Sequence, residues 1–61
     1  MQVTQEMILT AARELDRHTL RDKGWSEHII NEALSEFEGA TIANMKRAKI
    51  VLVAAVKKAT D

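Results

Sequence analysis

Two histidines are the side chains in this sequence best suited to acid–base or metal chemistry. His18 and His28 are its only imidazoles, Cys is absent, and Glu14 or Glu32 could lie near the pair. Structural zinc usually takes four ligands, and neither an HExxH spacing nor a nucleophile signature accompanies the histidines. Three short helices cannot easily enclose a substrate-sized cavity. We therefore expect no metal site, no cofactor and no enzymatic activity.

Three arginines, Arg13, Arg17 and Arg21, recur at every fourth position. This spacing places them on one edge of a helix, where like charges repel slightly. Helix stability therefore does not explain the row, which could form a secondary basic surface for an acidic partner or a phosphate backbone. The alternative, which we favour, is pairing with acidic residues of the same chain: Glu14, Asp16, Glu32 and Glu36.

Residues 26–58 fit the outline of a helix-turn-helix. Such a unit needs two helices, a short turn that often contains Gly, and a second helix whose exposed start reads DNA. Gly39 stands at the turn, and the reading side chains would be Thr41, Asn44 and Arg47. The formal net charge of zero and the glutamates of segment 26–38 argue against a surface that approaches phosphates. DNA binding is therefore our alternative function.

Helical spacing of apolar residues predicts the elements that position these side chains. Thr4, Ser26 and Thr41 are placed to cap the first turns of three helices, over about 5–22, 27–38 and 42–59. Gly24 and Gly39 are placed to end the first two helices in left-handed turns. The sequence thus predicts an all-α fold, a compact three-helix domain that covers residues 1–61.

The expected core contains the larger apolar side chains of the three helices: Leu20, Trp25, Ile30, Leu34, Phe37 and Leu52. A strand through residues 49–53 is the competing interpretation, because Ile and Val favour strands. That strand would have no obvious partner strand in this chain.

The third helix carries more apolar surface than one packed face needs. Ile50, Val51 and Val53 lie off its buried stripe, and a helix that is apolar most of the way round is buried on more than one side. With Lys46 and Lys49 at its border, this patch is typical of an interaction site. We expect a homodimer through the third helix and a protein partner at the same surface.

The longest apolar run, residues 50–56, is far shorter than the ~20 residues of a membrane span. The first residues show neither a basic start nor an apolar stretch of the kind found in a signal peptide. Absence of Cys fits a reducing compartment. These observations together predict a cytoplasmic protein without a membrane span.

Both ends of the chain resemble very short proteins encoded in bacteriophage and prophage genomes. The opening similarity is Thr4-Gln-Glu-Met7 with Ala11-Ala12-Arg13-x-Leu15, and the closing similarity is Arg47-Ala48 with Leu52-x-Ala54-Ala55. Segment 25–39 differs from those phage proteins because it is rich in Glu. The resemblance implies a small accessory protein that binds a host protein and alters it, and it carries over no functional residues. Our expected function is therefore a non-enzymatic protein-binding accessory module.

Overall fold

The computed structural model describes residues 2–60 and contains three helices: α1 (Gln5–Asp22), α2 (Glu27–Glu36) and α3 (Ile42–Thr60). The all-α, three-helix prediction is confirmed, and residues 49–53 lie within α3 rather than in a strand. None of the described helices combines the length and the apolar character needed to cross a membrane. Met1 and Asp61 lie outside the described residues.

Local capping signals set where each helix begins. Thr4, Ser26 and Thr41 each precede a helix. The side-chain oxygen of each accepts a hydrogen bond from the backbone N–H three residues later, at 3.1, 3.3 and 3.3 Å respectively. These N–H groups have no acceptor within the helix, so such caps stabilise a helix start by about 1 kcal/mol. All three predicted caps are confirmed.

Gly24 ends α1 as the sequence predicts. Its φ of 90° lies in the left-handed region. Its N–H donates to the carbonyl of Arg21 at 3.0 Å, and the N–H of Trp25 donates to the carbonyl of Leu20 at 3.2 Å. This pair of bonds is the Schellman motif, which satisfies carbonyls that the helix end leaves free.

Gly39 does not play the corresponding role for α2, so that prediction was wrong. The helix ends at Glu36, two residues before the predicted position 38, and Phe37 is extended with φ −104° and ψ 129°. Gly24 is the only described residue with a positive φ. The free carbonyls at the end of α2 are satisfied by an arginine of α1 instead of a glycine turn, as described below.

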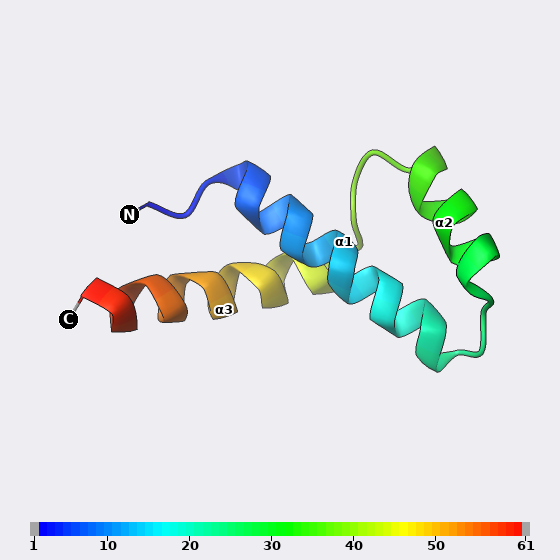
Figure 1. Cartoon of the computed structure of the whole chain (residues 1–61). Coiled ribbons are helices and arrows are strands. Elements are labelled where there is room, and N and C mark those ends of the chain that lie inside the picture. The colour runs from blue at the N-terminus through cyan, green and yellow to red at the C-terminus, as the bar shows by residue number, and fades with distance from the viewer. Residues whose placement is uncertain (1, 61) are drawn as a thin grey trace.

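The helices α2 and α3 both pack on α1 and not on one another (Figure 1). Ile8 and Ala12 of α1 form the main core with Ala48 of α3. The second packed region contains Ile30 and Leu34 of α2, which are buried and face α1. Every interhelical contact in the described chain therefore involves α1.

Trp25 and Phe37 are not core residues, contrary to our expectation. Their side chains are 44% and 68% exposed, and the expected core residues Leu20 and Leu52 are only partly buried. The cause is the path of α3, which runs back along the N-terminal half of α1 and leaves the junction of α1 and α2 uncovered (Figure 1). Predicting their burial from residue type assumed that α3 covers this junction.

We predict that Gly24→Ala destabilises the fold, because a Cβ at this φ meets its own backbone. The cost should be about 1–2 kcal/mol, which lowers the melting temperature by several degrees in a chain of this size. Thermal melting followed by circular dichroism measures the effect.

Gly39→Ala is the matched control. A Cβ at either glycine would meet no atom within 4 Å beyond the glycine and its two chain neighbours, and only Gly24 has a left-handed φ. Gly39→Ala should therefore leave stability unchanged or raise it slightly, since Ala restricts the unfolded chain more than Gly does. Equal melting of the two variants would contradict this account.

Candidate interaction surfaces

Arg13 of α1 closes the C-terminal end of α2. Its guanidinium donates to the carbonyl oxygens of Phe37 at 2.5 Å and Gly39 at 2.9 Å, and also to the carbonyl of Leu34. A helix end carries free carbonyls and partial negative charge, and arginine offers several donors in a fixed fork. Arg13 thus holds α2 against α1 and fixes where α2 ends.

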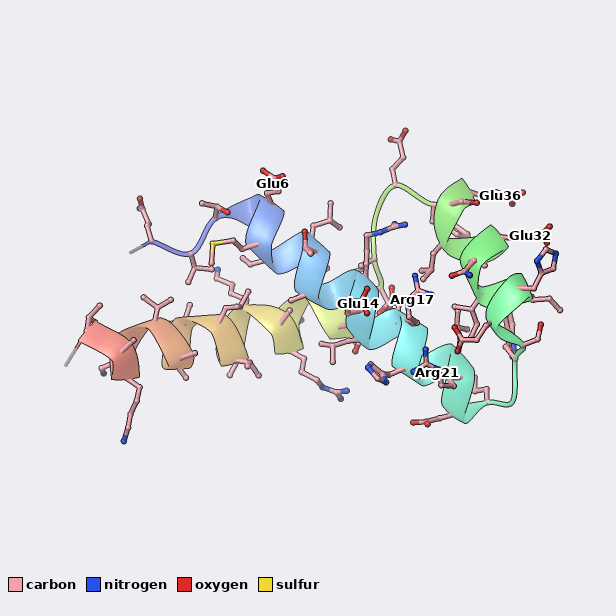
Figure 2. All side chains as sticks on the ribbon, in the orientation of Figure 1. Glu6, Glu14, Arg17, Arg21, Glu32 and Glu36 are labelled. Carbon is pink, nitrogen blue, oxygen red and sulfur yellow. The ribbon has the colours of Figure 1, made fainter. Side chains whose placement is uncertain are left out.

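Arg17 and Arg21 extend this contact toward the start of α2. Arg17 donates to the side-chain oxygen of Asn31 at 2.6 Å and lies 3.7 Å from Glu14. The Nε of Arg21 donates to Glu27 at 2.5 Å. This hydrogen bond raises the pKa of Arg21 and lowers the pKa of Glu27. Figure 2 shows both arginines on the side of α1 that faces α2.

The arginine row is therefore engaged within the chain rather than presented as a free basic surface. Glu14 is an acidic partner as expected, and the second partner is Glu27, which was not expected. Among the described residues, the arginines form no ion pair with the other three expected partners, Asp16, Glu32 and Glu36. Glu32 lies instead 3.5 Å from His28 on the exposed side of α2. The two outward-facing glutamates of α2, Glu32 and Glu36, remain at the surface (Figure 2).

We predict that Arg13→Ala weakens the packing of α2. Loss of a charged donor that satisfies several carbonyls should cost about 1–3 kcal/mol and should speed amide hydrogen exchange at the end of α2. Arg21→Ala is the control from the same row, because it removes only an exposed ion pair with Glu27. Equal effects of the two variants on melting and on exchange would contradict the assigned role of Arg13.

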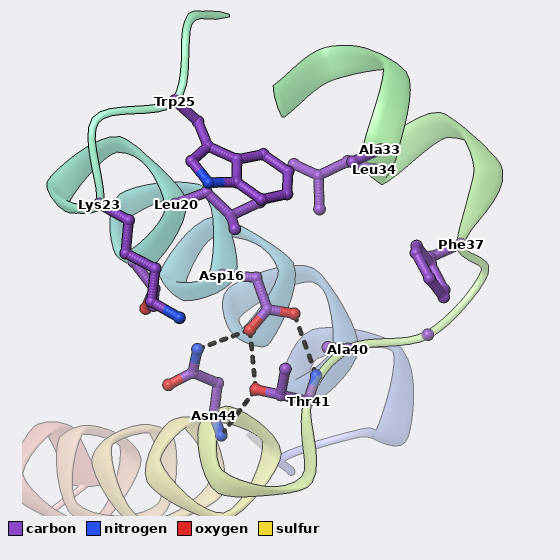
Figure 3. Close-up of a pocket in the computed structure, with 12 residues that line it drawn as sticks. Asp16, Leu20, Lys23, Trp25, Ala33, Leu34, Phe37, Ala40, Thr41 and Asn44 are labelled. Carbon is purple, nitrogen blue, oxygen red and sulfur yellow. Dashed lines mark hydrogen bonds between the residues drawn. The ribbon is translucent and has the colours of Figure 1, made fainter. Parts of the chain in front are cut away.

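Asp16 joins α1 to the start of α3. Its side chain is 9% exposed and accepts hydrogen bonds from the N–H of Thr41 at 3.0 Å, the hydroxyl of Thr41 at 2.8 Å and the side-chain amide of Asn44 at 2.6 Å. The same Thr41 hydroxyl accepts the capping bond from Asn44. Figure 3 shows the three residues as one bonded group.

Burial and hydrogen bonding act on Asp16 in opposite directions. Burial raises the pKa of Asp16. The hydrogen bonds from the Asn44 side chain and from the hydroxyl and N–H of Thr41 lower the pKa by more than burial raises it, so the net shift is downward. Hydrogen bonds that favour the charged form have this effect on a carboxylate. The ionised form of Asp16 therefore stabilises the fold.

The residues expected to contact DNA are placed differently from those of a reading helix. Asn44 is 6% exposed and bonded to Asp16, and Thr41 is bonded to the same carboxylate. Arg47 alone of the three is exposed without such a bond to Asp16. The two helices of a helix-turn-helix pack on one another, whereas α2 and α3 do not.

We predict that stability falls at acidic pH and that Asp16→Asn reduces this dependence. Because the folded pKa lies below the unfolded one, the stabilisation is complete above the unfolded pKa and is lost as the pH falls through the folded pKa. At neutral pH the variant should be less stable by about 1.5–3 kcal/mol, the worth of hydrogen bonds to a buried charged group.

Urea unfolding measured from about pH 7 down to about pH 2 tests this prediction. Glu6→Gln is the control, because Glu6 is an exposed carboxylate of the same helix. The prediction fails if Asp16→Asn keeps the full acid dependence of the parent protein.

An open apolar hollow lies between α1 and α2, with a volume of about 420 Å³. We call it the α1–α2 groove. Leu20 and Trp25 line one side of it, Ala33, Leu34 and Phe37 line the other, and the Asp16 group lies at one end (Figure 3). The sequence did not lead us to expect this groove. The feature that could have indicated it is the position of the two aromatic residues, because Trp25 precedes α2 and Phe37 follows it.

The apolar patch expected on the third helix lies on the surface of α3. Ile50, Val51 and Val53 are 70%, 59% and 47% exposed, and Lys46 and Lys49 beside them are exposed as well. Asn44 and Ala48 form the buried stripe of this helix. The α3 patch and the α1–α2 groove are therefore two separate apolar surfaces within residues 2–60.

Within residues 2–60, no three His, Asp or Glu side chains lie close enough together to hold a metal ion. Comparison of the chain with protein-family models, with curated proteins and with solved structures found no match.

Proposed function

We propose that this protein is a non-enzymatic protein-binding module that self-associates through α3. The observation that carries the proposal is the α3 patch. Ile50 and Val53 lie one helical turn apart and are exposed, Val51 next to Ile50 in the sequence is exposed as well, and Lys46 and Lys49 precede Ile50 and Val53 by one turn. Several large apolar side chains exposed together on one segment usually mark an interaction site.

The use of polar side chains supports a non-enzymatic role. Asp16 has the charge and burial that a general acid or base often has, yet its oxygens accept bonds that fix the start of α3. Arg13 and Arg17, which could bind an anionic substrate, hold α2 instead. These groups position helices rather than face the α3 patch.

The resemblance of both chain ends to phage-encoded proteins supports a more specific role. We propose an accessory protein that acts in a bacterial cytoplasm by binding a host protein and altering it. The arrangement of the helices favours this role over DNA reading, because Thr41 and Asn44 are bonded to Asp16.

The test is an affinity pull-down from nuclease-treated bacterial lysate with the tagged protein and two variants. The double variant Ile50→Glu/Val53→Glu places charge in the α3 patch, and His18→Glu adds one negative charge at an exposed position of α1. A charge at the centre of an interface should cost at least about 2 kcal/mol, roughly 30-fold in affinity.

The parent protein and His18→Glu should retain the same host protein in near-stoichiometric amount, and the double variant should lose it. Equal retention by all three proteins would show that the α3 patch is not the binding surface. Recovery of nucleic acid, or of proteins that nuclease removes, would favour the DNA-binding alternative.

A further inference from the structure

We propose that the α1–α2 groove receives the α3 patch of a second copy of this chain, and that two copies exchange these contacts in a closed dimer. The inference rests on the proposed function: the second copy is the first partner of the α3 patch, and a host protein binds that patch by displacing the second copy. It differs from a dimer in which α3 packs against α3.

The surface area of the chain matches what such a dimer needs. A compact folded protein of 6.9 kDa should expose about 4000 Å², whereas this chain exposes 4832 Å². The excess of roughly 800 Å² is close to the area that each partner contributes to a standard interface. The radius of gyration is 13.0 Å, whereas a compact chain of this length should have about 10.5 Å. The chain is therefore more extended than a compact domain, which agrees with its larger exposed area.

The α1–α2 groove has the shape of a missing third helix. In a bundle, a third helix packs on both members of a helix pair, but α3 packs on α1 alone. Leu20, Trp25 and Phe37 are left as apolar walls without a cover (Figure 3). A helix with protruding aliphatic side chains is the element that such a slot accommodates, because helices pack by inserting side chains between those of neighbours.

Apolar side chains continue from the groove along α2. Ile29 and Ala33 lie one helical turn apart on α2, Phe37 directly follows the end of the helix, and Ile29 is 51% exposed. Glu32 follows Ile29 by three residues and Glu36 follows Ala33 by three, so each glutamate is a neighbour of an apolar side chain on the surface of α2. The groove is therefore apolar, with the two glutamates along its α2 edge and Lys23 among the residues that line it at the end of α1.

The α3 patch has the opposite border. Lys46 precedes Ile50 by one helical turn, and Lys49 and Lys57 precede and follow Val53 by one turn. Placing α3 against the groove brings these lysines toward the glutamates of α2. Placing α3 against another α3 brings like charges together, which disfavours that pairing. The glutamates on the α2 edge therefore favour the groove over a second α3 as the partner of the α3 patch, provided that the lysines of α3 lie on the α2 side and not beside Lys23.

The molecule is 41 Å long, with α2 at one end, and the α3 patch lies in the middle turns of α3, which runs away from α2 toward the other end (Figure 1). Two copies placed side by side and antiparallel bring the acidic end of each to the basic end of the other. A two-fold axis then generates both contacts at once and closes the assembly. A dimer is therefore sufficient to cover all four surfaces.

The single tryptophan reports directly on this contact. Trp25 is the only Trp of the chain, is 44% exposed and lines the groove. Its fluorescence emission should shift to shorter wavelength as protein concentration rises and α3 of the second copy covers it. Pairing of α3 with α3 would leave its surroundings unchanged.

The decisive experiment is sedimentation of the full chain and two charge variants over a range of concentrations. Ile50→Glu/Val53→Glu alters the α3 patch, and Ile29→Lys/Phe37→Lys alters the groove border, all at exposed positions. Each variant alone should self-associate at least about tenfold more weakly than the parent. Their equimolar mixture should form a heterodimer, since one natural contact remains and the second pairs new lysines with new glutamates.

Several outcomes would overturn the inference. A parent chain that stays monomeric at high concentration would contradict it. So would a groove variant that dimerises as strongly as the parent. A dimer whose Trp25 emission equals that of the monomer would also contradict it. Assembly into longer chains would overturn the closed dimer. Circular dichroism melting confirms that each variant is folded, and His18→Glu serves as the charge control.

The outcome for the proposed function is read separately. A monomeric parent chain that still captures a host protein through the α3 patch would overturn the dimer and leave protein binding in place. A dimer with the expected Trp25 shift that captures no host protein would support the dimer and overturn the host-protein role.

Discussion

The carboxylate of Asp16 is the interaction on which the arrangement of this protein depends. It lies at the junction where the chain returns from α2 to α1, and three donors from Thr41 and Asn44 converge on it. A buried charge is costly unless it is fully bonded. The turn before α3 must therefore place both residues against α1, and this sets the point from which α3 departs.

Arg13 has the corresponding role for α2, and together the two side chains explain the open shape. Arg13 draws the end of α2 to one side of α1, while Asp16 holds the start of α3 near the middle of that helix. From there α3 runs back toward the N-terminal end of α1 and α2 stays at the other end (Figure 1). The α1–α2 groove is the space that these two anchors leave between them.

The features that could be predicted from the sequence are the local ones. Capping by Thr4 and the left-handed turn at Gly24 depend on residues within one or two turns, so their signals stand next to each other in the chain. The end of α2 depends on Arg13, whose acceptors lie 21 to 26 residues away. The role of Asp16 likewise depends on partners 25 and 28 residues later, and no local pattern marks them.

The candidate surfaces divide in the same way. Helical periodicity alone placed Ile50 and Val53 off the packed stripe of α3, and both are exposed. The same periodicity placed Arg17 on an edge of α1 but could not show that α2 lies against that edge. Trp25 and Phe37 were assigned to the core by residue type, whereas their exposure depends on the path of another helix.

Because α2 and α3 share no contact, each depends on α1 separately for its stability. Detaching α2 breaks its bonds with the arginine row and leaves the packing of Ile8, Ala12 and Ala48 intact. The helix α2 is therefore a unit that can detach on its own, and detaching it costs less free energy than unfolding the whole chain. Any molecule that covers the junction of α1 and α2 binds only the closed form, and by mass action it suppresses this opening. Binding at the junction of α1 and α2 and the attachment of α2 to α1 are therefore coupled, so whatever strengthens one strengthens the other.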